Sequence, residues 1–472
     1  MTTLQKSVEK AAKIINGHEY ARVISHYDAD GIASAGIICN ALLRRGIQFH
    51  ATIVHKLERA FIQGLNEELI IICDMGTAQS DLLSECLKDK DTDVVIIDHH
   101  APSTSVPVFR ASASSVLINP CCLSDAEEKR ELTNERGSTI CAAGLSYLVA
   151  RRMSSGDDTG NIDLAGLAIA GTLGDKLEFN TGVNRMILDE ANQEGVISVK
   201  KGLKLGNGKI RDLILFATDP YIPLAGKVEW VDAFLDKESI DGDKNLSDLT
   251  GEEEGRLTSA LLSLLRESQA DISDDALVGT TYNLHSEVIR DGRDFMRMVD
   301  ACGRLGKSGI GIGLCLREKK LIEEATSLYV SIQTKLVSEL NRIDREEDAI
   351  KELQNIFYFF VQESGVTGTL AGIVADYVRT SKPVIVLNKK DRGEEGKRAE
   401  TKISARCNKK LLSASGGIDL AKALEKASGE VDGFGGGHPV AAGASIPEGS
   451  EEKFIATLDT IIGEQKGKIN PR

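Results

Sequence analysis

Aspartate and histidine side chains occur in four short clusters within the first 175 residues. The set comprises His26, Asp28, Asp30, Asp74, Asp98, His99, His100 and Asp175. Carboxylates brought together without a counter-charge raise one another's pKa, and a pair of divalent cations removes that repulsion. Carboxylate and imidazole ligands suit Mn²⁺, Zn²⁺ or Fe²⁺ better than Ca²⁺. Two such ions can activate a water and clamp a phosphoryl oxygen, so this pattern favours phosphoester hydrolysis.

The elements that carry these clusters are short apolar runs, at 21–25, 69–73 and 94–97. Such runs, separated by helical patterns, predict a parallel sheet covered by helices on both faces. Each run ends at one cluster, and ligands bind at the carboxyl ends of parallel strands, so the clusters should converge on one crevice. We count the small, apolar run 164–174, which precedes Asp175, as a further strand end. The segment 26–30 is expected to be extended, which would send its three ligands to one side.

The remainder of the chain divides by pattern. The region 191–318 is less regular and is interpreted as an insertion or linking region that could dock a partner. It holds an acidic stretch, 236–256, which we interpret as a solvated face. Apolar residues then recur every three or four positions and predict a long connector helix over 319–345. Buried strands at 356–361, 383–387 and 401–407, with helices at 368–379 and 420–427, predict a second α/β unit. The expected domains are therefore 1–190, 191–318, 319–345 and 346–472.

Composition limits the class of protein. The net charge of −14 argues against a protein that coats nucleic acid through its overall charge. Nine scattered cysteines without a C-x-x-C pair indicate reduced, mostly buried thiols. No apolar stretch is long enough to span a membrane, and the N-terminus lacks the apolar region of a signal peptide, so we expect a cytoplasmic protein.

A local reversal of charge lies between residues 389 and 410, where nine basic residues stand against four acidic ones. A groove for single-stranded nucleic acid needs such a cluster, although a solvated hairpin that balances charge is an alternative. Ser404 and Arg406 fall on one side of a strand and suit a terminal phosphate. Downstream, the backbone of Gly435, Gly436 and Gly437 could approach a phosphate beside His438.

These residues resemble a known family. The segments His-x-Asp-x-Asp-Gly at 26–31, Asp98-His99-His100 and Gly174-Asp175, with the lone Asp74, are similar to the four motifs of the DHH phosphoesterases. The run Gly435-Gly436-Gly437-His438-Pro439 is similar to the signature of the associated DHHA1 domain. The resemblance implies an α/β protein with an N-terminal DHH domain, a connector helix, a smaller DHHA1 domain and an active site in the interdomain cleft.

The resemblance also implies roles for the residues. His26 and Asp28 would hold one metal, Asp74 would bridge, and the second metal would be held by Asp30, His99 and Asp175. His100 would contact the scissile phosphate and Asp98 would orient an imidazole. Two divalent ions are implied, with Mn²⁺ favoured and Mg²⁺ an alternative. The family also assigns phosphate binding to Ser404, Arg406, the glycine run and His438.

Within the superfamily, the spelling His-Tyr-Asp-Ala-Asp-Gly and the segment 300–306 resemble RecJ-type exonucleases, and in particular archaeal RecJ-like nucleases associated with the GINS complex. This implies hydrolysis of single-stranded DNA or RNA, with 5′→3′ action on DNA favoured, in replication and repair. One alternative is a 3′→5′ RNA or short-oligonucleotide phosphoesterase. Another is a scaffold subunit of the replicative helicase with secondary nuclease activity.

Overall fold

The computed structural model describes residues 2–102, 114–134, 137–154, 160–267, 274–389, 399–408, 411 and 417–467. The chain forms two compact units, and each combines two separate stretches of sequence. The first contains residues 1–202 and 280–329, and the second contains 203–279 and 330–472. The irregular region expected at 191–318 is therefore divided between them. No helix in the described part of the chain is long and apolar enough to cross a membrane.

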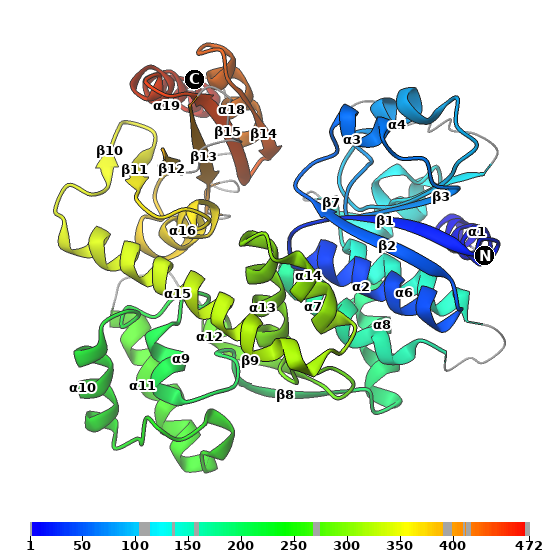
Figure 1. Ribbon diagram of the computed structural model, residues 1–472. Coiled ribbons are helices and arrows are strands. Elements are labelled where there is room, and N and C mark those ends of the chain that lie inside the picture. The colour runs from blue at the N-terminus through cyan, green and yellow to red at the C-terminus, as the bar shows by residue number, and fades with distance from the viewer. Residues whose placement is uncertain are drawn as a thin grey trace. The chain divides into compact units, whose positions relative to one another are not determined.

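The first unit is built on a parallel five-stranded sheet in the order β2-β1-β3-β4-β5 (Figure 1). Its central strands β1, β3 and β4 confirm the three apolar runs expected from the sequence. The edge strands β2 and β5 were not anticipated. The bounds are β1 Tyr20–His26, β2 Gln48–Val54, β3 Leu69–Cys73, β4 Asp93–Ile97 and β5 Ser115–Ile118.

Alternate side chains of these strands enter two hydrophobic cores. Val23, Ile71 and Val95 pack with α1, α2, α6 and α7 on one face. Ile24 and Ile72 pack with α3 and α4 on the other. Burial on both faces explains why the central strands are mostly apolar. The helices of this unit are α1 Thr3–Asn16, α2 Ala29–Arg44, α3 Arg59–Gln63, α4 Ser80–Leu87, α5 Ala126–Leu132, α6 Ala142–Met153, α7 Ala165–Gly174, α8 Gly182–Gln193, α13 Gly292–Arg304 and α14 Ser308–Cys315.

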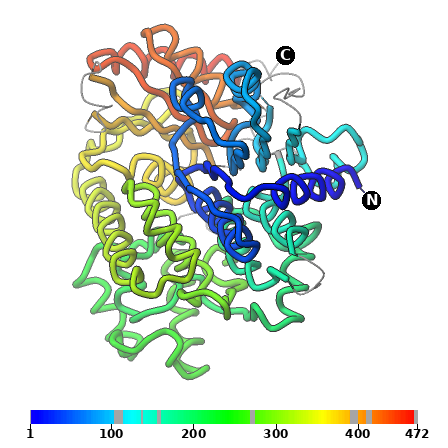
Figure 2. The backbone as a smooth tube through the Cα atoms, turned by 45° about the vertical axis from the view of Figure 1, so that its right-hand side comes forward, coloured from blue at the N-terminus to red at the C-terminus, as the bar shows by residue number. Residues whose placement is uncertain are grey.

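The run 164–174 forms a helix, so our prediction of a strand end before Asp175 was wrong. Residues 165–173 of α7 are all buried, and a helix that is apolar all round has no period that distinguishes it from a buried strand. Helices distant in sequence complete the same layer. In Figure 2 the yellow-green α13 and α14 lie beside the blue α2, and both pack against it.

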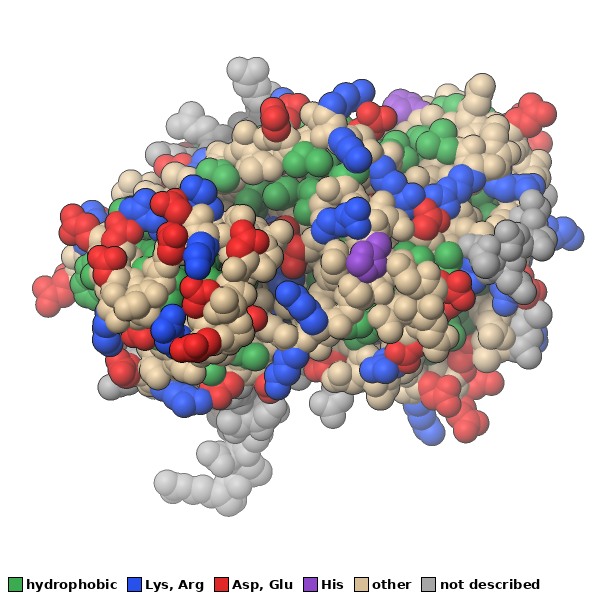
Figure 3. Space-filling model, turned by 90° about the horizontal axis from the view of Figure 1, so that it is seen from below, with side chains coloured by type: hydrophobic (Ala, Val, Ile, Leu, Met, Phe, Trp, Pro, Cys, Tyr) green, Lys and Arg blue, Asp and Glu red, His purple; other side chains and the backbone are tan. Residues whose placement is uncertain are grey.

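The segment 203–279 of the second unit has a hydrophobic core of its own, made by leucine, isoleucine and valine side chains of its helices. Short strands β8 and β9 lie at its two ends and pair with each other. Next to them, the backbone N–H of Lys204 donates to the carbonyl of Leu277 over 2.8 Å. The elements are β8 Ile197–Leu203, α9 Ile210–Leu215, α10 Val228–Glu238, α11 Gly251–Glu267, α12 Asp274–Leu277 and β9 Val278–Leu284. Acidic and basic side chains are interspersed over much of the face in Figure 3.

The rest of the second unit is a six-stranded mixed sheet in the order β10-β11-β12-β13-β15-β14. The long helix α15 lies where the sequence predicts one, and its residues 322–329 belong to the first unit and 330–345 to the second. Helix α16 packs on β12 and β13, whereas α18 packs on β14 and β15. The bounds are α15 Ile322–Arg345, β10 Lys351–Glu352, β11 Phe357–Val361, α16 Thr367–Ile373, β12 Val384–Asn388, β13 Glu400–Arg406, α18 Leu420–Gly429, β14 Phe434–His438, β15 Ala441–Pro447 and α19 Glu451–Gly467.

Candidate metal centre

The register of the first sheet brings the polar clusters to one edge. Ser25 pairs with Cys73, and Cys73 pairs with Ile97. His26, Asp74 and Asp98 each follow one of these paired residues, so they leave neighbouring strands at the same level. The expected convergence of the three strand ends is therefore present.

The segment 26–30 is not extended, contrary to our expectation. Strand β1 ends at His26 and α2 begins at Ala29. Asp28 caps this helix, because its Oδ1 accepts a hydrogen bond from the N–H of Gly31 over 3.0 Å. Gly31 lies so close to the backbone of His26 that a Cβ would meet its carbonyl oxygen at 2.4 Å. A tight strand-to-helix turn, rather than strand alternation, thus gathers these ligands.

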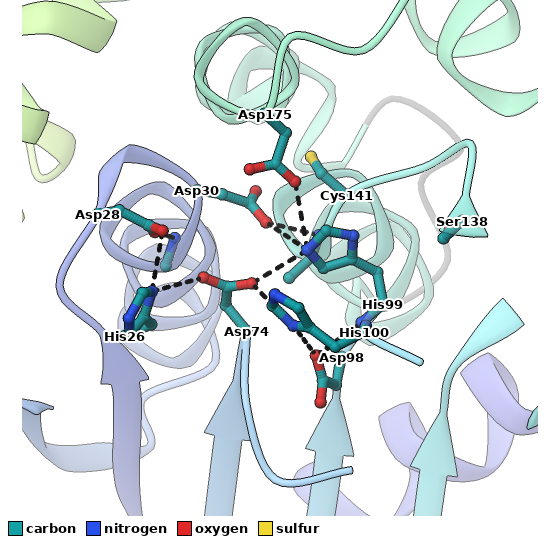
Figure 4. A network of polar contacts seen from close by, with 12 residues as sticks. His26, Asp28, Asp30, Asp74, Asp98, His99, His100, Ser138, Cys141 and Asp175 are labelled. Atoms are coloured by element: carbon teal, nitrogen blue, oxygen red, sulfur yellow. Dashed lines mark hydrogen bonds and ion pairs between the residues drawn. The ribbon is translucent and has the colours of Figure 1, made fainter. Parts of the chain in front are cut away.

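Asp74 adopts a left-handed backbone conformation, with φ of 58°. This region is uncommon for residues other than glycine, although aspartate tolerates it better than most. The backbone N–H of Asp74 donates to the carbonyl of Ile97 over 2.8 Å and fixes the turn at the end of β3. Its carboxylate is almost fully buried and points into the cluster (Figure 4).

Asp98 organises the Asp-His-His segment. Its Oδ1 accepts hydrogen bonds from the N–H groups of His99 and His100 and from Nδ1 of His100, at 2.8, 3.2 and 2.8 Å. Its Oδ2 accepts from the N–H of Thr77 over 2.9 Å. Burial alone would raise the pKa of Asp98, but the hydrogen bond with His100 and the charges of both histidines lower it. Asp98 is therefore held as a carboxylate that orients the neighbouring imidazole.

Two helices place the remaining carboxylates. Asp30 is a residue of α2, and its side chain reaches the N-terminus of α6. There its oxygens accept hydrogen bonds from the N–H groups of Ala142 and Ala143, both over 2.8 Å. Asp175 ends α7. Gly171 on α7 lies against Asp30, because a Cβ there would approach its Oδ1 to 2.7 Å. Close packing of α2, α6 and α7 thus sets the distance between the two carboxylates.

The side chains form three overlapping groups whose ligand atoms lie within 4.8 Å of one another: His26, Asp28 and Asp74; Asp30, His99 and Asp175; and Asp74, His99 and His100. Asp74 lies between the first two groups in Figure 4. Its Oδ2 is 3.3 Å from His26 Nδ1, and its Oδ1 is 3.3 Å from His99 Nε2. His99 Nε2 is also 3.2 Å from Asp175 Oδ2.

The pKa values show the cost of assembling these groups. Burial, with the nearby charges of Asp28 and Asp30, raises the pKa of Asp74 well above its usual range. Burial and the charge of Asp30 do the same for the pKa of Asp175. Burial opposes the charged form of His26, but contacts with Asp28 and Asp74 raise its pKa to about 11. Additional positive charge would stabilise the ionised carboxylates of this cluster.

The donor set fits divalent cations. Asp74 Oδ1 and Asp175 Oδ2 are buried and, among the described residues, accept no hydrogen bond of ordinary geometry. Imidazole nitrogens nevertheless lie close to both oxygens. Buried acceptors that face other ligand atoms, without a donor between them, are arranged as around a cation rather than as a hydrogen-bonded network.

Comparisons with known proteins identify the family of this chain. The DHH family N-terminal domain matches residues 21–172, and the DHHA1 domain matches residues 353–464. An uncharacterized protein of Methanocaldococcus jannaschii is 31% identical over 476 residues, covering 98% of both chains. The chain belongs to the DHH family. It thus has the DHH and DHHA1 domains that its motifs resemble.

Further relatives of this DHH protein are RecJ nucleases. The single-stranded-DNA-specific exonuclease RecJ of Bacillus subtilis is 23% identical over 49% of this chain and 29% of its own length. RecJ of Thermus thermophilus in complex with Mn²⁺ has a TM-score of 0.56 at 17% identity, over 97% of this chain and 55% of that one. CDC45 of Entamoeba histolytica has a TM-score of 0.65 at 11% identity, over 97% and 99%. The chain is a RecJ-like member of a hydrolase family.

The DHHA1 sheet brings the expected phosphate ligands to one face. Arg406 and His438 both pair with Ala441, and Ser404 and Gly436 both pair with Gly443. Residues in the same cross-strand row point to the same side. The four therefore share a face of strands β13 and β14.

Gly435 and Gly437 point the opposite way. A Cβ on Gly435 would meet the carbonyl of Leu424 on α18 at 3.0 Å. A Cβ on Gly437 would meet Ala442 at 2.7 Å. Their contacts are with packed backbone, and the glycine run is a strand rather than a turn or an anion nest. This corrects the conformation that we expected for the run.

The basic segment between residues 389 and 410 lies largely outside the described residues. Lys390, Arg392, Lys397, Arg398, Lys409 and Lys410 lie outside the described residues. The Nζ of Lys389 lies 5.4 Å from the centroid of the Phe360 ring. Lys402 is exposed on β13. The nucleic-acid groove at 389–410 stays a prediction.

The sequence did not reveal the residues that support the metal ligands. Asn119 donates to the hydroxyl of Thr77 and to the carbonyl of His100, over 2.8 and 2.9 Å. The sequence did hold a signal for Asn119, because this residue follows the apolar run 116–118 just as the Asp and His clusters follow the other apolar runs. The contacts of Ala142 and Ala143 with Asp30 had no such signal, because they are made by backbone groups far away in the sequence.

Proposed function

We propose that this protein is a metal-dependent exonuclease that hydrolyses phosphodiester bonds of single-stranded nucleic acid, with 5′→3′ action on DNA favoured. The observation that carries the proposal is the position of Asp74, which lies within 3.3 Å of a histidine nitrogen in each of two ligand groups. One carboxylate shared between two groups suits a pair of divalent ions. RecJ nucleases are among the relatives of the chain, which supports the substrate class.

His26 and Asp28 would hold one ion, and Asp30, His99 and Asp175 would hold the other, with Asp74 shared. We favour Mn²⁺, with Mg²⁺ as an alternative, because carboxylates dominate the set and no cysteine contributes to it. When bound, such ions supply charge that lowers the pKa of a water and neutralises the phosphoryl oxygens. The protein's part is to fix the ligands and to hold the phosphate.

We assign the phosphate contact to His100. Asp98 accepts the hydrogen bond from Nδ1 of His100, which fixes the orientation of the ring. Burial opposes the charged imidazole, but the contact with Asp98 raises the pKa of His100 and favours the cation. A cationic donor suits a negatively charged phosphoryl oxygen.

On the DHHA1 sheet, Ser404, Arg406 and His438 would bind a phosphate of the substrate. Their shared face provides a hydroxyl, a guanidinium and an imidazole. Arg406 is well suited to this role because its planar group donates two parallel hydrogen bonds to phosphate oxygens. Gly436 leaves room beside them, since no atom lies within 4 Å of where its Cβ would be.

Digestion of single-stranded DNA and RNA labelled at the 5′ or the 3′ end tests the proposal. With Mn²⁺ we expect mononucleotide release from one end, and no cleavage by Asp175→Ala. Asp189→Ala, which changes an exposed carboxylate on α8, is the matched control and should cut normally. Undiminished cleavage by Asp175→Ala, or in excess chelator, would overturn the proposal.

A short-oligonucleotide phosphoesterase, or a 3′→5′ nuclease for RNA, is the alternative use of the same cluster. The ligand set is equally suited to a short substrate, because it binds one phosphodiester at a time. Chain length separates the two. Cleavage rates that collapse for substrates longer than a few nucleotides would favour the short-oligonucleotide phosphoesterase. Release of nucleotides from the 3′ end of RNA would favour the 3′→5′ nuclease.

We also propose association with the GINS complex, with or without a scaffolding role. The similarity in fold to CDC45 supports a place among replication proteins, and the segment 203–279, with its own core, is the proposed docking element. Purified GINS should be retained by the wild-type protein and by Asp175→Ala. Equal retention by a protein in which the exposed Trp230 of this segment and its neighbour Val228 are changed to serine would contradict this docking site.

A further inference from the structure

A cavity of about 540 Å³ lies in the first unit beside the metal centre. It is formed by the end of strand β2, by the loop after β1 and by the turn between α13 and α14. Its lining residues are Tyr27, Ala51, Thr52, Ile53, His55, Gly303, Gly306, Ser308, Gly309 and Ile312. This volume is within the range of pockets that hold small ligands.

The cavity begins one residue from the metal centre. Tyr27 lies between His26 and Asp28 in the sequence, and its ring contacts the ring of His26 at a centroid distance of 4.5 Å, edge to face. On its other side the Tyr27 ring packs against His55 at 4.2 Å. Tyr27 thus separates the ligand cluster from the cavity and provides an aromatic wall.

The opposite wall is the turn between α13 and α14. Gly303 touches the backbone of Tyr27 so closely that a Cβ would meet its carbonyl oxygen at 1.6 Å, so only glycine can stand there. Gly309, in the first turn of α14, has no atom within 4 Å of its Cβ position. The turn therefore holds Tyr27 in place at one point and leaves open space at another.

The chemistry of the lining defines the ligand. The cavity has no aspartate, glutamate, lysine or arginine among its lining residues. It combines apolar side chains, two aromatic rings and the hydroxyls of Thr52 and Ser308. Such a lining disfavours a phosphate or a metal ion and suits a flat, neutral group with a few polar edges.

We propose that this cavity receives the base of the nucleotide next to the scissile phosphate, packed against the paired rings of Tyr27 and His55. The proposal rests on the proposed function, since it requires a nucleotide at the metal centre. In a nucleotide a single sugar separates base from phosphate, and here a single residue separates cavity from ligand cluster. Stacking on an aromatic ring accepts every base, so the cavity holds the chain without selecting a sequence.

Filling the cavity gives the cleanest variant. Gly309→Leu places a side chain in the open space and replaces glycine with a better helix former. Gly255→Leu on α11 is the matched control, because its Cβ position is also open and it lies outside the cavity. Tyr27→Ala removes the ring, and Tyr27→Phe keeps it.

The first readout is cleavage of single-stranded DNA with Mn²⁺. We expect Gly309→Leu and Tyr27→Ala to raise KM about 10-fold, the size of one base–aromatic stacking contact, whereas Gly255→Leu stays near wild type. Tyr27→Phe, which keeps the ring, should raise KM less than Tyr27→Ala does. DNA with an abasic residue at one of the two positions flanking the scissile bond should show the same loss with wild-type protein and no further loss with Gly309→Leu. Equal KM values for the abasic and normal substrates with wild-type protein would overturn the proposal.

The second readout needs no turnover. Calorimetry with Mn²⁺ should show that wild-type protein binds dAMP about 10-fold more tightly than deoxyribose 5-phosphate, and that Gly309→Leu abolishes this difference. If DNA is not cleaved but this difference is found, the exonuclease proposal fails and the base site stands. If DNA is cleaved but no difference is found, the base site fails alone.

Discussion

At the scale of single residues, Asp98 shows how a residue without a proposed ligand role can determine the site. It is buried and accepts four hydrogen bonds, from three N–H groups of the backbone and one imidazole. Three of these bonds fix the turn that carries His99 and His100, and the fourth ties it to Thr77 in the loop after β3. The charge of the carboxylate and its acceptor-only character are both needed.

Asp98→Asn should therefore weaken metal binding although it preserves the shape of the side chain. The amide would direct an NH₂ group at N–H donors, and one of the fixed hydrogen bonds would be lost. Because Asp98 accepts from the backbone N–H of His99, a proposed ligand, we expect Mn²⁺ affinity to fall about 5-fold, the size of one lost hydrogen bond. Calorimetric titration with Mn²⁺ measures this. Asp93→Asn, at the partly exposed start of the strand that Asp98 follows, is the control, and equal affinities for both variants would contradict the assigned role.

At the scale of elements, the site depends on how closely α7 packs against α2 and α6. Gly171→Ala should disturb it, because the added Cβ would lie 2.5 Å from Ala143 and 2.7 Å from Asp30. We expect the unit to lose about 1–3 kcal/mol of unfolding free energy, as overpacked cores do, together with Mn²⁺ affinity.

Urea unfolding and Mn²⁺ titration of the same samples test this. Gly372→Ala on α16 is the matched control, since its Cβ position is open and alanine favours a helix. That variant should keep its Mn²⁺ affinity and be no less stable than wild type. An unchanged Gly171→Ala protein would show that the three helices can separate without cost to the site.

A second contact of α7 gives a pH dependence. Glu287 is buried against Gly166 of α7, and its Oε1 accepts from Arg317 over 3.2 Å. Burial raises the pKa of Glu287 to about 7, in spite of the opposing effect of Arg317. Between the ordinary glutamate pKa of about 4.5 and pH 7, the unfolded chain loses this proton while the native protein keeps it. The unfolding free energy should therefore fall as the pH rises through this window.

The decrease from Glu287 alone is about 3 kcal/mol. Above pH 7 both states are ionised and its contribution becomes constant. Urea unfolding of wild type and Glu287→Gln at several pH values isolates the effect, because the other groups titrate in both proteins. The stability of wild type relative to the variant should decrease from pH 4.5 to 7, and parallel profiles would refute the assignment.

The elements that could be predicted from sequence are those whose burial leaves a clear pattern. Strands β1, β3 and β4 lie inside the sheet and are mostly apolar and buried, whereas the edge strand β2 has a mixed sequence and was missed. The six proposed ligands do lie in one cluster, because strand ends and helix termini were marked by Asp and His. The sequence could not show that α7 is a helix, or that backbone groups of α6 hold Asp30, since neither leaves a local signal.

At the scale of the whole molecule, the proposed metal ligands all belong to the first unit, and the second unit has cores of its own. A ligand that binds only the folded state stabilises the part of the protein that binds it. Scanning calorimetry should therefore show two transitions, of which Mn²⁺ raises only one. At 100 times the dissociation constant the stabilisation is about 2.7 kcal/mol, which for a unit of this size corresponds to about 5–10 °C.

Two variants show which of the two unfolding transitions belongs to the unit that holds the proposed metal ligands. Asp175→Ala should lose the Mn²⁺ shift while Asp189→Ala keeps it, and neither should move the second transition. Chelator added to the wild type should return the first transition to its metal-free position. Equal Mn²⁺ shifts of both transitions would mean that the two units unfold together. The second unit would then contribute to metal affinity through its stability, although it holds none of the proposed ligands.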